Sequence, residues 1–268
     1  MDNDNHFPET SDDDFLSGAV VLRQPIDGYR AGTDAVLLAA CVEKTGSKAS
    51  QRWLDMGAGV GAVGLAVASR ITGVHITAIE KDPFCAELLK YNISANSSQA
   101  CMRALCGDVT QMPSILKGSF DQVFANPPFH HPADQPPQSR RRHLAHNGDG
   151  PGLDKWIESG LWALKARGRM TFIIRADRTD EALVTLRNSG AGEILLYPIW
   201  SYADSPAIRM VITARKDVKG TMALLPGLVL HRPTGALTSI AQKVMKGEGL
   251  GLVHPAARHL HKSGQTPL

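Results

Sequence analysis

Short apolar runs alternate with helical patterns along most of this chain, and that alternation is typical of a parallel sheet covered by helices. The predicted strands cover residues 54–56, 75–80, 102–106, 123–124, 169–174, 193–199 and 208–214. The predicted helices cover residues 35–42, stretches starting at 61 and at 83, and residues 153–164, 180–188 and 238–245. An apolar run at 19–22 predicts a β-hairpin within residues 15–30. The pattern therefore predicts an α/β fold with an N-terminal hairpin.

The first predicted strand ends in a carboxylate and a glycine-rich turn, Asp55-Met56-Gly57-Ala58-Gly59-Val60-Gly61-Ala62. Glycines accept positive φ and let a ligand approach the backbone at the edge where open α/β sheets bind ligands. The turn fits the dinucleotide pattern G-x-G-x-x-G/A and equally the D-x-G-x-G-x-G turn of S-adenosylmethionine enzymes. Glu80, at the tip of the second strand, suits ribose hydroxyls in both cases. A purely structural turn is the third interpretation.

A later strand runs into a polar residue and two prolines, Asn126-Pro127-Pro128-Phe129. Each proline fixes φ and removes an N–H donor, so the stretch forms a rigid platform. The amide oxygen of Asn126 and the adjacent main-chain carbonyls remain as acceptors beside an aromatic face, which suits a planar group that bears an NH2. A proline-terminated strand followed by a buried Phe is the alternative that this stretch alone allows.

Together, D-M-G-A-G-V-G and N-P-P-F resemble class I S-adenosylmethionine-dependent methyltransferases that modify an exocyclic or amide nitrogen. The run G-Y-R-A-G-T-D-A-V-L-L-A at 28–39 is similar to the segment ahead of the glycine turn in bacterial tRNA (adenine-N6)-methyltransferases acting on a valine tRNA beside its anticodon. The resemblance covers roughly residues 16–245. One departure is Phe129, where Tyr is common, but a ring face for stacking remains.

The resemblance implies a Rossmann-like seven-stranded methyltransferase sheet, mostly parallel with an antiparallel last strand and with helices on both faces. Four segments are expected: a disordered acidic tail at 1–14, a hairpin and helix covering the cofactor pocket at 15–50, the methyltransferase domain at 51–246, and a loose tail at 247–268. Thr33 is expected to cap the helix that follows the hairpin.

The resemblance also implies roles for individual residues. The catalytic corner is Asn126, Pro127, Pro128 and Phe129. The residues expected to bind S-adenosylmethionine are Arg30, Gly32, Thr33, Asp34, Asp55, Gly57, Ala58, Gly59, Gly61, Glu80, Lys81, Asp108, Val109 and Asn126. Among them, Asp108 is expected to accept a hydrogen bond from the adenine amino group of the cofactor.

Charge adds a candidate RNA contact. The formal net charge is +3, although the first 14 residues hold six acids and no Lys or Arg, so the remainder is more basic than the whole. The proline-rich loop after Phe129 carries Arg140, Arg141, Arg142 and His143, which predicts contacts with nucleic-acid phosphates. A solvated surface insertion is the alternative.

Other features limit the class of protein. The chain has no apolar run long enough for a membrane span and no basic-then-apolar leader pattern, so a soluble cytoplasmic protein is expected. Its four cysteines show no C-x-x-C spacing, so no metal is expected. A monomer or weak homodimer is expected.

The predicted function is methyl transfer from S-adenosylmethionine to N6 of an adenine in RNA, with tRNA as the expected partner. Three alternatives use the same glycine turn: a methyltransferase acting on glutamine of a release factor, one acting on DNA or rRNA, and a non-catalytic RNA-binding module with a vestigial cofactor pocket. A dinucleotide oxidoreductase is disfavoured, because nothing in that chemistry requires N-P-P-F.

Overall fold

The computed structural model describes residues 9–27, 30–46, 48–128 and 151–252 of the chain. Its main strands are β3 (Gln51–Met56), β4 (Val74–Glu80), β5 (Met102–Cys106), β6 (Phe120–Ala125), β7 (Leu164–Arg175), β8 (Gly192–Trp200) and β9 (Ala207–Arg215). They form one sheet in the order β5-β4-β3-β6-β7-β9-β8. All of its neighbours pair in parallel except β9, which is antiparallel to both β7 and β8. The expected seven-stranded sheet with an antiparallel last strand is therefore confirmed.

Two short strands extend this sheet at the β8 edge. They are β10 (Ala223–Leu224) and β11 (Leu228–Val229), and both pair in parallel with β8. The pairing covers an edge strand whose backbone groups would otherwise remain open to solvent. The sheet thus contains nine strands among the residues that the structure describes.

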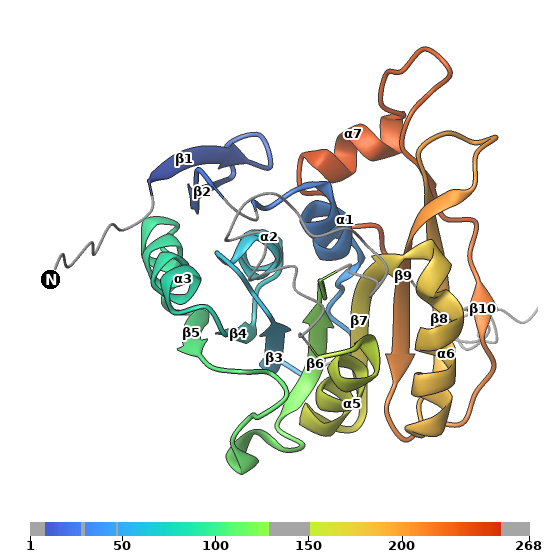
Figure 1. The fold of residues 1–268 in the computed structure, drawn as a ribbon, viewed down its shortest axis with the longest axis horizontal. Coiled ribbons are helices and arrows are strands. Elements are labelled where there is room, and N and C mark those ends of the chain that lie inside the picture. The colour runs from blue at the N-terminus through green and yellow to red at the C-terminus, as the bar shows by residue number, and fades with distance from the viewer. Residues whose placement is uncertain (1–8, 28–29, 47, 129–150, 253–268) are drawn as a thin grey trace, which may run out of the picture.

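Helices cover both faces of the sheet, as expected (Figure 1). One core cluster holds α1 (Thr33–Cys41), α2 (Ala62–Arg70), α3 (Pro83–Ala95) and α7 (Ser239–Met245) against one face. The second cluster holds α5 (Leu153–Ala163) and α6 (Thr179–Asn188) against the other. Short 3-10 turns lie at Ser114–Leu116 and Ala176–Arg178. No helix in the described ranges is long and apolar enough to cross a membrane.

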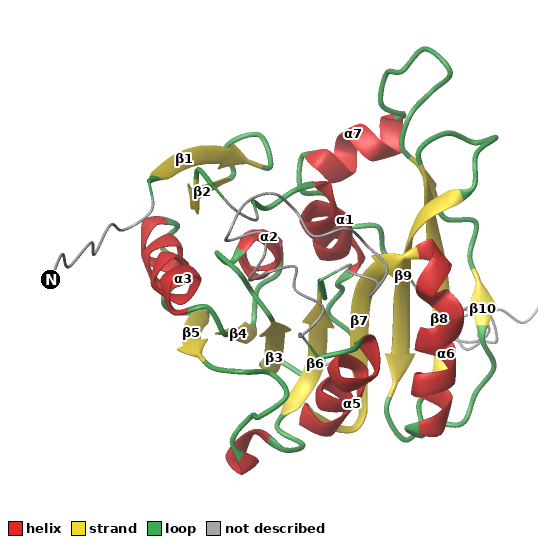
Figure 2. Cartoon of the chain, viewed as in Figure 1, coloured by secondary structure: helices red, strands yellow, loops and turns green. Residues whose placement is uncertain are grey.

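The N-terminal hairpin starts earlier than expected. Strand β1 (Thr10–Phe15) pairs antiparallel with β2 (Val20–Pro25) in a separate two-stranded sheet. Figure 2 shows the hairpin above α3. The prediction of a disordered tail is therefore wrong for residues 10–14, whereas residues 1–8 lie outside the described part. Cationic partners explain the difference: Asp12 accepts from Arg23 at 2.7 Å, and Asp13 pairs with Arg30. These pairs compensate two of the three acidic side chains of β1.

Two smaller expectations also need correction. Helix α1 has Gly32 as its N-cap and no side-chain cap, so Thr33 is the first helical residue instead of the cap. The stretch 247–252 belongs to the packed structure, because the Leu250 N–H donates to the Ala40 carbonyl at 2.8 Å and its side chain contacts the core. The remaining part of the expected loose tail, residues 253–268, lies outside the described residues.

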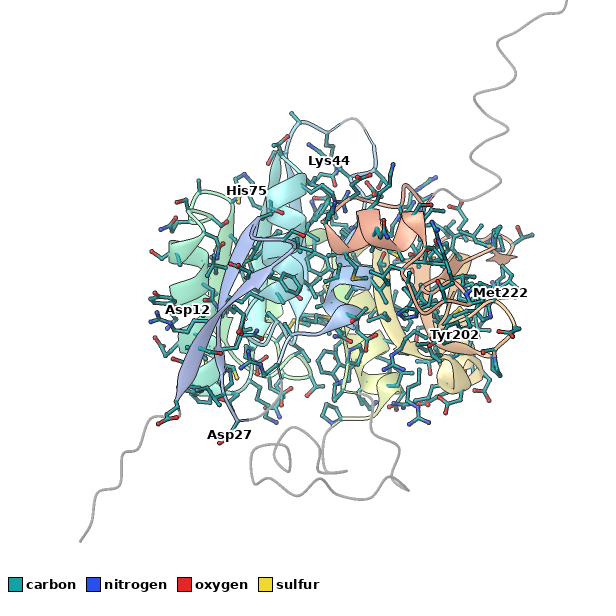
Figure 3. The ribbon with its side chains drawn as sticks, turned by 90° about the horizontal axis from the view of Figure 1, so that it is seen from above. Asp12, Asp27, Lys44, His75, Tyr202 and Met222 are labelled. Carbon is teal, nitrogen blue, oxygen red and sulfur yellow. The ribbon has the colours of Figure 1, made fainter. Side chains whose placement is uncertain are left out.

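Seen from above, the hairpin and the loop after β8 lie on opposite sides of the molecule, marked by Asp12 and Tyr202 (Figure 3). Because β3, β4, β5 and β6 pair in parallel, their carboxyl ends lie together at one edge of the sheet. This edge is where open α/β sheets bind ligands, so the fold places the predicted site residues there.

At the opposite edge, Asp121 links three strands. It accepts from the Lys165 ammonium at 2.8 Å, the Lys48 ammonium at 2.9 Å and the Arg52 N–H at 3.0 Å. Burial acts to raise its pKa, but these hydrogen bonds outweigh burial and lower the pKa of Asp121 to about 2. A carboxylate with a lowered pKa stabilises the fold above its ordinary pKa, and this contribution is lost as the pH falls toward 2.

We therefore expect Asp121→Asn to lower the free energy of unfolding at pH 7 by about 1 to 2 kcal/mol, a figure that allows for solvent screening of the exposed lysines. Urea denaturation at pH 7 and pH 3 checks this. The difference in the free energy of unfolding between the native chain and the variant should be smaller at pH 3 than at pH 7. A difference of equal size at both pH values would contradict the lowered pKa of Asp121.

Candidate functional site

The predicted glycine turn follows β3 at the carboxyl edge of the sheet. Backbone hydrogen bonds tie it to its neighbours: the Ala58 N–H donates to the Ile79 carbonyl at 2.9 Å, and the Gly107 N–H donates to the Glu80 carbonyl at 2.8 Å. The loops after β3, β4 and β5 are thereby joined side by side. The structure thus brings together the glycine turn, Glu80 and the segment that carries Asp108.

The turn itself requires its glycines. Gly59 has φ of +56°, a conformation that side chains rarely adopt, and a Cβ added there would meet nothing within 4 Å. The backbone at Gly59 is therefore open to a ligand. Gly57 differs, because a Cβ there would run into the ring of Trp156 on α5. The sequence predicts the helix that carries Trp156, but no local pattern indicates that the Trp156 ring supports the turn.

Glu80 holds the turn through its side chain. One carboxylate oxygen accepts from the Gly59 N–H at 2.8 Å, and the other accepts from the Asp82 N–H at 2.8 Å. Each oxygen has further lone-pair capacity, so these bonds do not exhaust the carboxylate as an acceptor. Burial raises the pKa of Glu80. Glu80 thus fixes the turn and remains half-buried beside it.

Asp55 lies beneath the same turn and is only 1% exposed. It accepts from the N–H of Gly64, in the first turn of α2, at 2.9 Å. Burial, opposed by this bond and aided to a smaller extent by the nearby Glu80 carboxylate, raises the pKa of Asp55 to about 7. A buried carboxylate so close to a second one favours a cation in the vicinity.

Asp108 follows β5, where the sequence placed it. Its carboxylate accepts from Lys81 at 2.8 Å and from the Thr110 N–H and hydroxyl at 2.8 and 2.7 Å. Burial acts to raise the pKa of Asp108, but these partners outweigh it and leave the pKa below its ordinary value. The Lys81 side chain is 71% exposed, so Asp108 has one mobile partner. The neighbouring Val109 packs its side chain into the core.

The Asn126 corner lies next to the turn. Met56 and Ala125 are partners in the register of β3 and β6, so Gly57 and Asn126 emerge side by side. Asn126 is half-buried, Pro127 is buried and Pro128 is exposed. These three residues have no regular secondary structure, as expected for a platform fixed by prolines.

The predicted site residues at the start of α1 and just before it include two charged side chains that are paired within the protein. The Arg30 guanidinium donates to Asp13, Ser11 and the Pro25 carbonyl, so it fastens the hairpin. Asp34 pairs with Arg209 of β9 at 3.0 Å. Gly32 and Thr33 are exposed, and a Cβ added at Gly32 would meet nothing within 4 Å. The open backbone of this segment, more than its charged side chains, is available to a ligand.

Several predicted residues cannot be placed. Phe129 and the basic residues Arg140, Arg141, Arg142 and His143 lie outside the described residues. Within the described part, no three His, Cys, Asp or Glu side chains gather to hold a metal ion.

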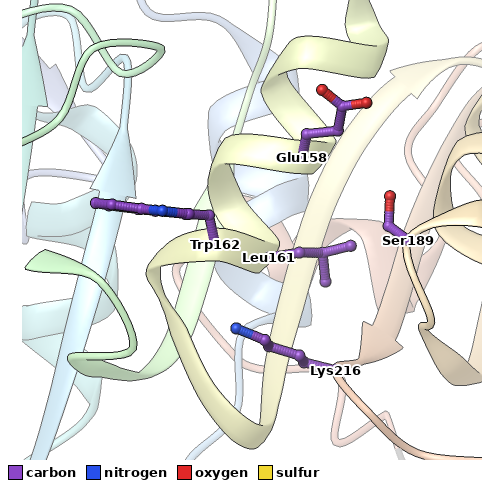
Figure 4. Close-up of a pocket in the computed structure, with 5 residues that line it drawn as sticks. All are labelled: Glu158, Leu161, Trp162, Ser189 and Lys216. Carbon is purple, nitrogen blue, oxygen red and sulfur yellow. The ribbon is translucent and has the colours of Figure 1, made fainter. Parts of the chain in front are cut away.

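The surface also has two shallow hollows, and neither contains a predicted site residue. One of about 240 Å³ lies between α5 and the ends of α6 and β9; its lining is Glu158, Leu161, Trp162, Ser189 and Lys216 (Figure 4). The other, of about 530 Å³, lies between the hairpin turn and the segment after α7. Because β9 runs antiparallel, the first hollow lies at the edge of the sheet opposite the glycine turn. The strand ends, and not these hollows, define the candidate site.

Comparison with known proteins gives a consistent result. The family described as "Methyltransferase small domain" matches residues 30–149. A protein of Flavobacterium psychrophilum named tRNA1(Val) (adenine(37)-N6)-methyltransferase is 31% identical over 182 residues, covering 66% of this chain and 73% of that protein. A protein of the same name from Porphyromonas gingivalis is 31% identical over 156 residues, and the match spans 57% of this chain and 61% of that relative's length.

Solved structures share the fold. A predicted O-methyltransferase of Agrobacterium tumefaciens superposes with a TM-score of 0.66 at 24% identity, covering 81% of this chain and 97% of that one. The TYW2 protein of M. jannaschii, solved in complex with AdoMet, gives 0.53 at 15% identity, covering 78% and 85%. At these identities the likeness concerns the fold alone.

The raised pKa of Asp55 leads to a pH prediction. A group whose pKa is raised by folding contributes stability that is lost as the pH rises from its ordinary value, near 4, to its folded value. For Asp55 that window is about pH 4 to 7. Asp55→Asn keeps an oxygen for the Gly64 N–H and removes the ionisation. Between pH 5 and pH 8, we expect the free energy of unfolding of the variant to rise by about 2 to 4 kcal/mol relative to that of the native chain.

Chemical denaturation at the two pH values measures this change. Glu158→Gln, an exposed substitution on α5, is the control and should follow the native pH dependence. If the free energies of unfolding of Asp55→Asn and the native chain differ by the same amount at both pH values, Asp55 is already ionised at pH 5.

Proposed function

Because this chain belongs to the class I S-adenosylmethionine-dependent methyltransferases, in the family of the bacterial tRNA1(Val) (adenine(37)-N6)-methyltransferases, we propose that it methylates N6 of an adenine in tRNA. The observation that carries the proposal is that an open glycine turn and the Asn126-Pro127-Pro128 corner emerge side by side from β3 and β6. The glycine turn would hold the cofactor, and the Asn126 corner would receive the amino group that is methylated. The names of the relatives support adenine in tRNA as the acceptor.

The residues at the sheet edge fit S-adenosylmethionine. When bound, this cofactor supplies an electrophilic methyl group on a positively charged sulfur. The open backbone at Gly59 and the adjacent start of α2 would hold its methionine part. Glu80 would accept from ribose hydroxyls, and Asp108 from the adenine amino group. The buried carboxylate of Asp55 beneath the turn favours a cation above it.

The Asn126 corner would prepare the acceptor. An aromatic amine is a poor nucleophile because its lone pair is delocalised into the ring. Hydrogen bonds from the amino group to the Asn126 side-chain oxygen and the Pro127 carbonyl would localise that lone pair and direct it at the methyl group. Holding the two reactants in line is the main contribution of the protein, and such placement lowers a barrier by several kcal/mol. The protonated product amine is strongly acidic, so no dedicated general base is required.

Two parts of the proposal depend on residues outside the described ranges. Phe129 would stack on the target base, which contributes about 1 to 3 kcal/mol in comparable cases. Arg140, Arg141, Arg142 and His143 would contact phosphates without reading the base sequence. A base in a tRNA loop costs little to unstack compared with a base in a duplex. On this proposal the protein acts in the cytoplasm, as a monomer or weak homodimer.

Transfer of labelled methyl from S-adenosylmethionine to unmodified bulk tRNA, digested to nucleosides, tests the proposal. We expect label in N6-methyladenosine with the native chain. Asn126→Ala removes the amide acceptor, so we expect a loss of about 100-fold or more in the rate of methyl transfer at a saturating cofactor concentration.

Asn188→Ala is the matched control, because Asn188 is exposed at the end of α6, away from the glycine turn. It should retain native activity. Cofactor binding without any label in tRNA would refute the tRNA proposal, and a release factor and DNA would then be offered as acceptors. Label that persists in Asn126→Ala would refute the assigned corner.

A further inference from the structure

Two asparagines hold the hairpin by its backbone: Asn92 in the last turns of α3, and Asn96, the residue that caps the end of this helix. Asn96 accepts from the Val21 N–H at 2.9 Å and donates to the Val21 carbonyl at 2.7 Å. Asn92 accepts from the Arg23 N–H at 2.8 Å and donates to the Arg23 carbonyl at 3.0 Å. Figure 3 shows the hairpin lying across this helix. The two side-chain amides therefore take the place of a third strand beside β2.

The spacing explains why this arrangement works. Residues four apart on a helix rise by about 6 Å, and residues two apart on a strand advance by about 6.6 Å. Backbone groups of alternate strand residues point to the same edge. Asn96 therefore matches Val21 and Asn92 matches Arg23, the alternate residues whose backbone groups face α3.

Asn92 also binds the glycine turn. It is 0% exposed, and the second proton of its side-chain amide goes to the Val60 carbonyl at 2.9 Å. One amide thus donates to both the hairpin and the turn. Asn96 donates its second proton to the Asn92 carbonyl on its own helix. Of these two asparagines, only Asn92 bonds both the hairpin and the glycine turn.

The Val60–Gly61 peptide lies between two glycines with positive φ. Its N–H donates within the turn, to the Ala58 carbonyl at 2.8 Å, and its carbonyl is held from outside the turn by Asn92. Glu80 holds the N–H of Gly59 from one side, and Asn92 holds the Val60 carbonyl from the other. Leu89 of α3 packs so closely on Gly61 that an added Cβ would lie 2.6 Å from its methyl carbon. Side chains of α3 therefore help to fix the conformation of the glycine turn.

We propose that Asn92 is a positioning residue that couples docking of the N-terminal hairpin to the ligand-binding conformation of the glycine turn. This inference rests on the proposed function for the identity of the ligand, S-adenosylmethionine. Coupling between two sites is reciprocal. Binding of S-adenosylmethionine must then favour the docked hairpin, and loss of the hairpin contact at Asn92 must weaken binding.

Asn92→Ala and Asn96→Ala form a matched pair, since each removes two hydrogen bonds to the hairpin and only the first removes the bond to Val60. Titration calorimetry with S-adenosylmethionine should give at least tenfold weaker binding for Asn92→Ala and a change of less than about threefold for Asn96→Ala. The saturated rate of methyl transfer should fall much less than the affinity in Asn92→Ala. Equal affinities in the two variants would overturn the inference.

Hydrogen exchange on the native chain tests the coupling without any variant. The amide protons of Val21 and Arg23 should exchange several-fold more slowly when S-adenosylmethionine is bound. Unchanged exchange at both amides, in a chain that binds the cofactor, would overturn the inference and leave the proposed function intact. A native chain that binds no S-adenosylmethionine would overturn the proposed function and this inference together.

Discussion

The carboxylate of Glu80 is the interaction on which the site depends. It bonds the Gly59 N–H with one oxygen and the Asp82 N–H with the other, so it fixes both the glycine turn and the start of α3. Asp82 in turn caps α3 by accepting from the N–H groups of Phe84 and Cys85. Because α3 carries Asn92, the same connection extends to the hairpin. The parallel strands bring their carboxyl ends to one edge of the sheet, and Glu80 fixes the loops that follow them.

This organisation explains why the site has acidic groups that would otherwise destabilise it. Asp55 and Glu80 both have raised pKa values, chiefly because burial disfavours the charged form of each, and burying charge is unfavourable without a partner. A positively charged cofactor supplies that partner in the proposed reaction. Asp121, at the opposite edge of the sheet, accepts hydrogen bonds from two lysines and has a lowered pKa. The contrast separates a carboxylate that is paired within the fold from two carboxylates that, in the proposed function, lie beside a positively charged cofactor.

The sequence was sufficient to predict the order of strands and helices, because each is a short apolar segment bounded by glycine, proline or a polar residue. It was also sufficient to place Gly59, Glu80 and Asp108 at one edge, since parallel strands align their carboxyl ends. It did not reveal the β1 strand, whose acidic residues are neutralised by Arg23 and Arg30. Nor did it reveal Asn92 or Trp156, because their contacts join segments that are distant along the chain and no local pattern records them.

A crystal structure of the chain with S-adenosylmethionine tests the central claim most directly. The account predicts cofactor density over the open backbone at Gly59, with its reactive end facing the Asn126 corner. Density in the hollow beside Trp162, or no density at a saturating cofactor concentration, would contradict it.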